Sequence, residues 1–334
     1  MTWHRRVLMG DPEHFSVKGG ANPHTRTRLG TRRSVDRATA VTQWRRLRDT
    51  LRDLGVRVVV VPADPGQPGL VYPANAGFLP FVDAEKPPFD KTFFLSNLIA
   101  TRAGERSHYE RVVTSQGMRA AAVPDHLRFE GEADFFPAGD SHLLTHGQLE
   151  NQRWVPRVGI PPWKRIYGFR TDARVETFLA PLVAPRPVLC IELVLETHYH
   201  GDTALCAFGS AREHLLVWRP ALAPESFERL QAKFGDALIE LSDGDAAHYA
   251  ANSFALSGPD PVLVLPAGVS DRLLAQVRGC GVRPLTVDVG EFLAKGGGSV
   301  KCMIGDLGLF EVAPPRSTGA PSPASDRAAI HPVS

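Results

Sequence analysis

VTQWRRLRDTLRDLGVRVVVV, residues 41–61, places a helical pattern and a strand pattern on either side of one glycine. Its first part has apolar side chains at the spacing of one helical face, with arginine and aspartate between them: Val41, Trp44, Leu47, Leu51 and Leu54. We predict an amphipathic helix over residues 34–54 that ends at Gly55, and a buried strand over residues 56–61. This order of elements is the building unit of an α/β fold.

The same order of helix, glycine and strand occurs twice more. Residues 230–235 precede an apolar run at 237–241, and residues 273–279 precede a second run at 281–287. Three copies of one pattern indicate a repeated α/β architecture. Other predicted strands lie at residues 188–195, 215–218 and 262–265.

Composition limits the classes of function. The chain has 38 basic and 36 acidic residues, a net charge of +2, so it shows no footprint for nucleic acid or for a membrane surface. Its four cysteines lack Cys-x-x-Cys spacing, which indicates neither a zinc ribbon nor a disulfide framework. No signal peptide or bilayer-spanning run is evident, so a cytoplasmic location is expected. We predict one domain over residues 1–312 and a disordered tail, rich in proline and serine, over residues 313–334.

Residues 296–302, GGGSVKC, place three glycines before a cysteine. Glycines let the backbone come close to a ligand. A cysteine at the end of such a loop suits a nucleophile whose thiolate is favoured by nearby donors. A tight turn with a small buried cysteine explains the same residues.

Residues 197–203, THYHGDT, alternate two histidines and an aspartate. On a strand, His198, His200 and Asp202 would face one side, an arrangement that suits a metal ion. Alternatively, His200 is a general acid and base, and Asp202 binds a cationic substrate. A structural cluster is the third interpretation.

Residues 129–136, FEGEADFF, alternate three acids between aromatic side chains. Acids inside an apolar strand are costly unless they are paired. They therefore orient a histidine or bind a guanidinium, or else they form the polar face of a half-exposed strand. Two further segments contain polar candidates, Asn75 in a turn and Arg170, which suits a carboxylate or a surface salt bridge.

Taken in order, these segments resemble the guanidino-group-modifying (pentein) superfamily, which includes arginine deiminases, dimethylarginine dimethylaminohydrolases and amidinotransferases. The likeness extends to about residue 310 and depends on the whole ordered set of segments: 74–77, 102–105, 130–134, 168–172, 199–203, and 296–298 with Cys302. It implies an α/β fold of five modules arranged as a propeller with pseudo-fivefold symmetry. It also implies an active site in the central channel and no metal or other cofactor.

The resemblance implies catalytic roles for three residues. Cys302 matches the cysteine that attacks the guanidinium carbon, and His200 matches the histidine that protonates the leaving amine. Glu130 matches the acid that holds this histidine, but the acidic segment is one residue longer here than in the family. Glu132 is therefore a rival for that role.

The resemblance also implies substrate contacts. Asp202 matches an aspartate that binds guanidinium nitrogens, and Glu132 and Asp134 are further acidic candidates. Arg170 matches an arginine that binds the substrate carboxylate, and Arg102 is a second candidate. A separate departure is Asn75, which falls where many relatives carry aspartate. An amide attracts a cation less strongly, and it can accept one N–H or tolerate a ureido oxygen.

The predicted reaction is hydrolysis of arginine or a methylated arginine through a covalent cysteine intermediate, giving a ureido product such as citrulline. An amidinotransferase, which passes the amidino group to an amine, is the first alternative. Two alternatives come from other classes: a metal-dependent hydrolase that uses His198, His200 and Asp202, and a non-catalytic pentein that binds a partner. The expected partners are a small guanidino molecule and, in a homodimer, a second copy of the chain.

Overall fold

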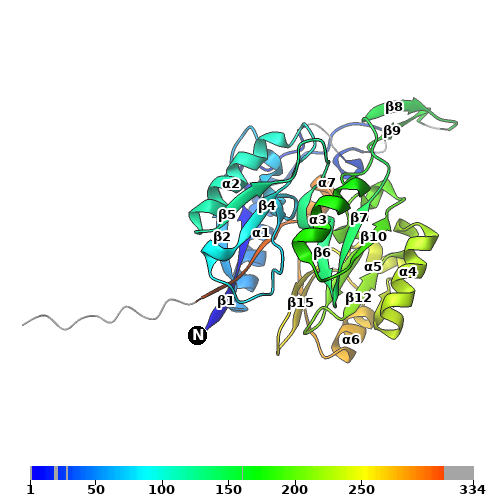
Figure 1. Ribbon diagram of the computed structural model, residues 1–334. Helices are drawn as coiled ribbons and strands as arrows, with labels where there is room; N and C mark the ends of the chain where they lie inside the picture. The colour runs from blue at the N-terminus through cyan, green and yellow to red at the C-terminus, as the bar shows by residue number, and fades with distance from the viewer. Residues whose placement is uncertain (1, 19–21, 28, 160, 312–334) are drawn as a thin grey trace, which may run out of the picture.

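The computed structural model describes residues 2–18, 22–27, 29–159 and 161–311, which form a mixed α/β fold (Figure 1). These residues contain five three-stranded sheets and one two-stranded ribbon. None of their helices is both long and apolar enough to cross a membrane. The tail predicted at residues 313–334 lies outside the described residues.

Each three-stranded sheet has a central strand that pairs antiparallel with one neighbour and parallel with the other. In the order antiparallel edge, centre and parallel edge, the sheets are β17 (Gly305–Glu311), β1 (Trp3–Gly10) and β2 (Arg57–Val61); β3 (Gly77–Phe78), β4 (Thr92–Leu95) and β5 (Arg119–Ala122); β6 (Phe135–Ala138), β7 (Ser141–His146) and β10 (Val188–Glu192); β11 (Leu205–Phe208), β12 (His214–Val217) and β13 (Leu238–Glu240); and β14 (Phe254–Leu256), β15 (Val262–Pro266) and β16 (Arg283–Val287). The ribbon of β8 (Arg153–Pro156) and β9 (Trp163–Ile166) projects from the body in Figure 1.

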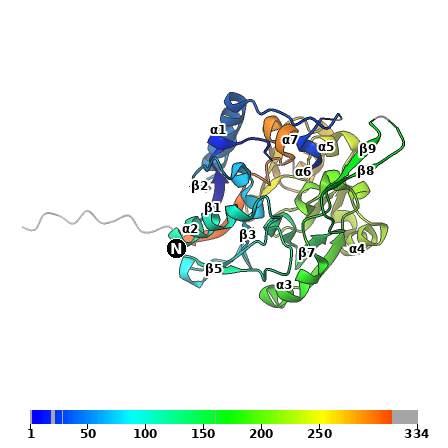
Figure 2. The ribbon, with the colours of Figure 1, turned by 90° about the horizontal axis from the view of Figure 1, so that it is seen from above.

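A helix lies between the central strand and the parallel edge strand of each sheet, because two parallel strands need a crossover connection. These helices are α1 (Arg37–Asp53), α2 (Arg106–Ser115), α3 (Glu176–Val183), α4 (Pro224–Phe234) and α6 (Asp271–Gly279). Two shorter helices are α5 (Asp243–Ala247) and α7 (Gly290–Gly296). Figure 2 shows α1, α3 and α4 at the periphery of the molecule, which leaves the strands and their connecting turns inside.

The helix predicted over residues 34–54 is α1, and the strand predicted after it is β2. Asp36 caps α1 by accepting a hydrogen bond from the Thr39 backbone N–H at 3.1 Å. Trp44 and Leu47 of the predicted apolar face are buried in a core cluster that also includes strand residues of β1, β15 and β16. Gly55 has φ +78°, the left-handed conformation that glycine supplies at a helix end.

The predicted repeat of helix, glycine and strand is confirmed at all three of its positions, where β2, β13 and β16 follow α1, α4 and α6. Gly117 between α2 and β5 completes a fourth copy. The pattern analysis missed this copy because β5 has the sequence RAAA. Three alanines lack the β-branched or aromatic side chains that indicate a strand.

Two segments that were interpreted as strands form turns instead. In residues 129–136, a short 3-10 turn occupies Gly131–Ala133 and the strand β6 begins only afterwards. In residues 197–203, two such turns occupy Glu196–His198 and Gly201–Thr203. The backbone of Gly131 has φ +72° and passes so close to its neighbours that a Cβ there would lie 2.7 Å from two carbonyl oxygens. The acids and histidines of these segments therefore point in different directions.

Gly131→Ala should lower the free energy of unfolding more than Gly55→Ala does. Both substitutions force alanine into a left-handed conformation, which costs about 1–3 kcal/mol. Only residue 131 adds a steric clash, because no atom lies within 4 Å of a Cβ built on Gly55, and overpacking costs roughly another 1–3 kcal/mol. Urea denaturation of the two variants measures the difference. Equal midpoints would contradict the close packing described at Gly131.

Candidate active site

A short turn precedes the antiparallel edge strand of every three-stranded sheet, and each turn contains a polar residue. The turns lie within residues 72–75, 130–134, 200–203, 249–252 and 299–303, and they contain Asn75, Asp134, Asp202, Asn252 and Cys302. Because the five turns occupy the same place in five similar sheets, side chains that are distant in the sequence are brought together.

Hydrogen bonds link these five turns into a closed ring. Going around the ring, the bonds run from Ala74 N to Cys302 O (3.3 Å), from Lys301 N to Asn252 O (3.0 Å), from Asn252 Nδ2 to Asp202 O (3.0 Å), from Gly201 N to Asp134 Oδ1 (2.9 Å) and from Asn75 Nδ2 to Glu130 O (3.4 Å). The ring fixes the relative positions of the polar side chains that the turns carry.

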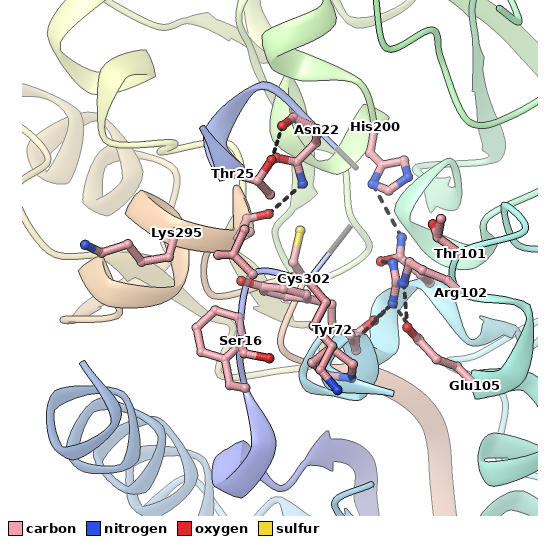
Figure 3. A pocket seen from close by; sticks show the side chains of 18 of the residues that line it. Ser16, Asn22, Thr25, Tyr72, Thr101, Arg102, Glu105, His200, Lys295 and Cys302 are labelled. Carbon is pink, nitrogen blue, oxygen red and sulfur yellow. Dashed lines mark hydrogen bonds and ion pairs between the residues drawn. The ribbon is translucent and has the colours of Figure 1, made fainter. Parts of the chain in front are cut away.

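A cavity with an empty volume of about 830 Å³, including its open mouth, lies against this ring. Cys302, His200, Asn75 and Arg102 line it, together with Tyr72, Tyr199 and residues of the segments 15–18 and 22–25. Figure 3 shows His200 and Cys302 on neighbouring sides of the cavity. Its lining of aromatic side chains and a few polar groups is typical of a site for a small molecule.

His200 forms an ion pair with Glu130, with 2.9 Å between the histidine Nε2 and the glutamate Oε2. Both side chains are buried. Burial lowers the pKa of His200, but the charges of Asp134 and Glu130 outweigh it and the net shift is upward. Burial raises the pKa of Glu130, but the contact with His200 outweighs it and lowers the pKa to about 2. Because Nε2 donates to Glu130, the nitrogen that can exchange a proton in the cavity is Nδ1.

Cys302 and Asp202 lie side by side, with 3.4 Å between the Cys302 Sγ and the Asp202 Oδ2. Burial, together with the neighbouring Asp202, raises the pKa of the Cys302 thiol well above its ordinary value. Burial likewise raises the pKa of Asp202 to about 6. Within the described residues, Asp202 Oδ1 is buried and has no hydrogen-bond partner. An unpaired carboxylate oxygen beside a thiol is suited to accept an N–H of a cationic ligand.

In the free protein, Cys302 should react slowly with iodoacetamide at neutral pH, and its rate should rise as the pH passes 9. The raised pKa keeps the thiol protonated, and only the thiolate is nucleophilic. Asp202→Asn removes the neighbouring negative charge, so the rise should move to lower pH. Peptide mapping of the alkylated protein measures both profiles. A wild-type rate that is already constant below pH 7 would contradict this assignment.

Asn75 is held by Arg102, whose Nη1 donates to the Asn75 Oδ1 at 2.7 Å. Glu105 fixes Arg102 in turn through contacts of 2.8 and 2.7 Å to its Nε and Nη2. The amide oxygen of Asn75 is thus engaged, and its Nδ2 lies 3.4 Å from the Nδ1 of His200. Asn75 therefore presents a donor toward the reactive nitrogen of His200, so the geometry favours the ureido-oxygen alternative over acceptance of a substrate N–H.

None of the four predicted acids, Glu130, Glu132, Asp134 and Asp202, is among the residues that line this cavity. Glu130 and Asp202 contact its lining residues His200 and Cys302. Lys301 forms an ion pair with Glu132 at 2.6 Å, and Glu132 and Asp202 both line a second cavity. Asp134 accepts hydrogen bonds from the hydroxyls of Thr145 and Thr171 at 2.7 and 2.6 Å. The structure thus places Glu130, not its rival Glu132, against His200. It gives Glu132 and Asp134 supporting positions instead of the predicted contacts with substrate.

Arg170 and His198 also lie outside the described lining of the main cavity. The Arg170 guanidinium lies over the ring of Tyr199, 5.2 Å from its centroid, so a direct contact with a substrate carboxylate is not supported by its position. His198 stacks on Tyr249 with 4.9 Å between the ring centroids, and burial lowers its pKa to about 4. In residues 2–18, 22–27, 29–159 and 161–311, no group of three or more His, Cys, Asp or Glu side chains is arranged to hold a metal ion.

Asn252 is a site residue that the sequence analysis missed. Its Nδ2 donates to the Cys302 Sγ at 3.1 Å. The sequence contained one indication of its role. Asn252 follows Tyr249 by three residues, as Asn75 follows Tyr72, and a phenylalanine comes two or three residues after each asparagine. Asparagine in an alanine-rich stretch is ordinarily a turn residue, and nothing in the local pattern tied residue 252 to residue 302.

Comparisons with known proteins give the family. The chain is 31% identical over 299 residues to the N(G),N(G)-dimethylarginine dimethylaminohydrolase of Mycobacterium tuberculosis, covering 89% of this chain and 84% of the relative. It is 26% identical to the bifunctional arginine dihydrolase/ornithine cyclodeaminase ArgZ of Synechocystis, covering 89% of this chain but 37% of that protein. No family model matches the chain.

Solved structures share the fold. The N-terminal domain of the cyanobacterial arginine dihydrolase ArgZ, bound to substrate, superimposes with a TM-score of 0.74 at 23% identity and covers 91% of this chain and 98% of that one. A histidine-to-glycine variant of a dimethylarginine dimethylaminohydrolase, an adduct with S-methyl-L-thiocitrulline, gives a TM-score of 0.62 at 18% identity and covers 91% and 99%.

The fold and the cavity with its cysteine, histidine and acidic side chains define an enzyme of the guanidino-group-modifying class, which confirms the resemblance found in the sequence. The chain is a C–N hydrolase. It belongs to the dimethylarginine dimethylaminohydrolase family.

Proposed function

We propose that this chain hydrolyses the guanidinium group of arginine or a methylated arginine and releases a ureido product and an amine, with Cys302 as the nucleophile. One observation carries the proposal. Cys302 and His200 line the same cavity, Glu130 contacts His200, and Asp202 has an unpaired carboxylate oxygen beside the thiol.

The first half of the reaction forms the covalent intermediate. The guanidinium donates an N–H to Asp202 Oδ1, and its positive charge offsets the repulsion between Asp202 and a Cys302 thiolate. Binding of this cation therefore favours loss of the thiol proton to solvent. The thiolate forms a bond to the guanidinium carbon. His200, whose raised pKa favours its protonated form, transfers a proton from Nδ1 to the departing nitrogen. The C–N bond breaks, and an amine and an alkylthiouronium on Cys302 result.

The second half releases the product. His200 is now neutral and accepts a proton from an incoming water, which forms a C–O bond to the same carbon. The C–S bond then breaks and Cys302 returns as the thiolate, and the hydroxyl on the carbon loses its proton to solvent as the C=O of the ureido product forms. Glu130 stabilises the imidazolium in each half, because its pKa of about 2 keeps it ionised. Asn75 Nδ2, which lies 3.4 Å from Nδ1 of His200, is placed to donate to the new ureido oxygen.

Arg102 is proposed to act mainly through Asn75, because Glu105 and backbone carbonyls already engage most of its donors. It lines the cavity and keeps one Nη1 hydrogen for a substrate carboxylate. Arg170 is proposed to support Tyr199, one layer behind the cavity.

The five sheets are proposed to be the five modules of a pentein, arranged with pseudo-fivefold symmetry in one catalytic domain. The common strand pairing of the sheets and the closed ring of five turns support this arrangement. The axis would pass through the ring, which places the catalytic side chains at the centre of the molecule.

A product assay tests the proposed function and its substrate. The names of the relatives point to dimethylarginine and arginine, so the panel contains arginine, monomethylarginine and both dimethylarginines, each with and without an added amine such as glycine. The proposal expects a ureido product and free amine or ammonia with no acceptor present. Product that forms only with the added amine would instead establish an amidinotransferase. No turnover of any member would overturn the substrate class.

A further inference from the structure

Asn252 makes all of its side-chain hydrogen bonds around the nucleophile. It is fully buried. Its Oδ1 accepts from the backbone N–H groups of Ser299 at 2.9 Å and Cys302 at 3.1 Å. Its Nδ2 donates to the Asp202 carbonyl at 3.0 Å and to the Cys302 Sγ at 3.1 Å.

These contacts fix the direction of the amide group. Two backbone N–H donors hold the oxygen, so the nitrogen must face Cys302 and Asp202, and its two hydrogens match the two acceptors there. A hydrogen bond from this nitrogen to sulfur is stronger when the sulfur is a thiolate, because the acceptor is then charged. The hydrogen bond from Asn252 lowers the pKa of Cys302, against the raising effects of burial and of Asp202.

Asn252 also occupies the same place in its sheet as a residue of the proposed reaction occupies in another. It lies in the turn before β14, two residues before the strand begins, as Asn75 lies two residues before β3. Both turns belong to the hydrogen-bonded ring that also contains Asp202 and Cys302.

We infer that Asn252 is a catalytic residue, which donates a hydrogen bond to the Cys302 thiolate and stabilises it before attack and after product release. This inference rests on the proposed function only in taking Cys302 as the nucleophile. The stabilisation is largest when the sulfur carries its full charge and fades as the C–S bond forms. Asn252 therefore acts on the ionisation of the nucleophile, and it makes no contact that would recognise the substrate.

Two substitutions separate this role from a structural one. Asn252→Asp has the same shape and keeps an acceptor for the Ser299 and Cys302 backbone N–H groups, but it replaces the donor with a carboxylate. Asn252→Asp adds a buried carboxylate beside that of Asp202, which can prevent folding. Asn252→Ser is smaller and uncharged, so it tests the same role without adding a charge. Thermal unfolding identifies the variants that retain the fold.

The readout is the pH dependence of Cys302 alkylation by iodoacetamide without substrate, followed by peptide mapping. Cys190 and Cys280 in the same samples are internal controls, because both are partly exposed and belong to other parts of the fold. The charged and titratable groups around Cys302 include Asp202, His200, Lys301, Tyr72, Tyr199 and Tyr249, and Lys18, Arg102, Glu105 and Lys295 line the same cavity. They are unchanged in both variants, so a shift is assigned to residue 252.

Asn252→Ser should slow alkylation of Cys302 at pH 8 by about tenfold to a hundredfold, the range for losing a hydrogen bond to a charged group. Asn252→Asp should slow it further, and Cys190 and Cys280 should not change. In the assay, kcat should fall and KM should change less than threefold. A folded variant whose Cys302 profile superimposes on the wild-type profile would overturn the inference, even if its turnover is lost. A shifted Cys302 profile would support the role of Asn252 whether or not the wild type turns over a guanidino compound. Absence of turnover would count against the proposed function and not against the role of Asn252.

Discussion

Cys302→Ser should retain the fold and bind a guanidino substrate while kcat falls by more than about 10³-fold. A serine hydroxyl has a far higher pKa than a thiol, so without a strong base beside it the nucleophilic anion is not formed. Asp202, whose Oδ2 lies 3.4 Å from the Cys302 sulfur, is the neighbouring group placed to accept its proton. The burial that raises the pKa of Asp202 to about 6 does not make it basic enough to ionise an alcohol.

Steady-state kinetics and substrate binding by calorimetry measure this prediction. Cys280→Ser is the matched control, because Cys280 is a free, partly exposed cysteine that does not line the main cavity. The control should keep wild-type kcat within about twofold. If Cys302→Ser retained a tenth or more of the wild-type kcat, another residue would have to be the nucleophile.

His200→Ala should lower kcat by about 10²- to 10⁴-fold, the usual contribution of a positioned general acid and base. The substitution removes the proton donor to the leaving amine and the base that activates water, and it leaves Glu130 as a buried acid without its partner. The loss should be smaller for a substrate whose leaving group needs less assistance from an acid, such as an S-methylthiocitrulline.

His198→Gln is the control for this variant, because His198 is two residues away but stacks on Tyr249 and does not line the described cavity. It should keep kcat within about threefold. The same pair tests the metal-dependent alternative, in which His198 and His200 are both ligands and the two substitutions would be equally damaging. Equal losses would contradict the assignment made here.

The fold could be predicted from the sequence wherever the periodicity was strong. The helices α1, α4 and α6 have a clear apolar face and a glycine at their end, so the pattern placed them correctly. Residues 129–136 and 197–203 were interpreted as strands because they alternate polar and other residues, but this alternation does not come from the two faces of a sheet. Their side chains point in several directions from turns, and close backbone approaches at Gly131 and Gly201 require those turns. Such an approach depends on a distant segment and has no local signal.

The candidate site was predicted less evenly. Cys302, His200, Glu130 and Asp202 stood out through rare residue types in short motifs and through the family resemblance, and the structure brings them together. The position of Arg170 behind Tyr199 could not be predicted, because an arginine has the same local pattern in a cavity wall and in a supporting layer. Asn252 was missed because its partners are residues 202 and 299–302, and single-sequence patterns do not report long-range contacts.

The central claim is that Cys302 forms a covalent intermediate with a guanidino substrate. Rapid acid quenching of the wild-type enzyme during turnover of monomethylarginine or dimethylarginine, followed by intact-mass and peptide mass spectrometry, tests it most directly. The account predicts a transient mass increase that maps to the peptide containing Cys302 and decays as the ureido product accumulates. Steady turnover with no adduct on any peptide, or an adduct confined to another cysteine, would contradict it.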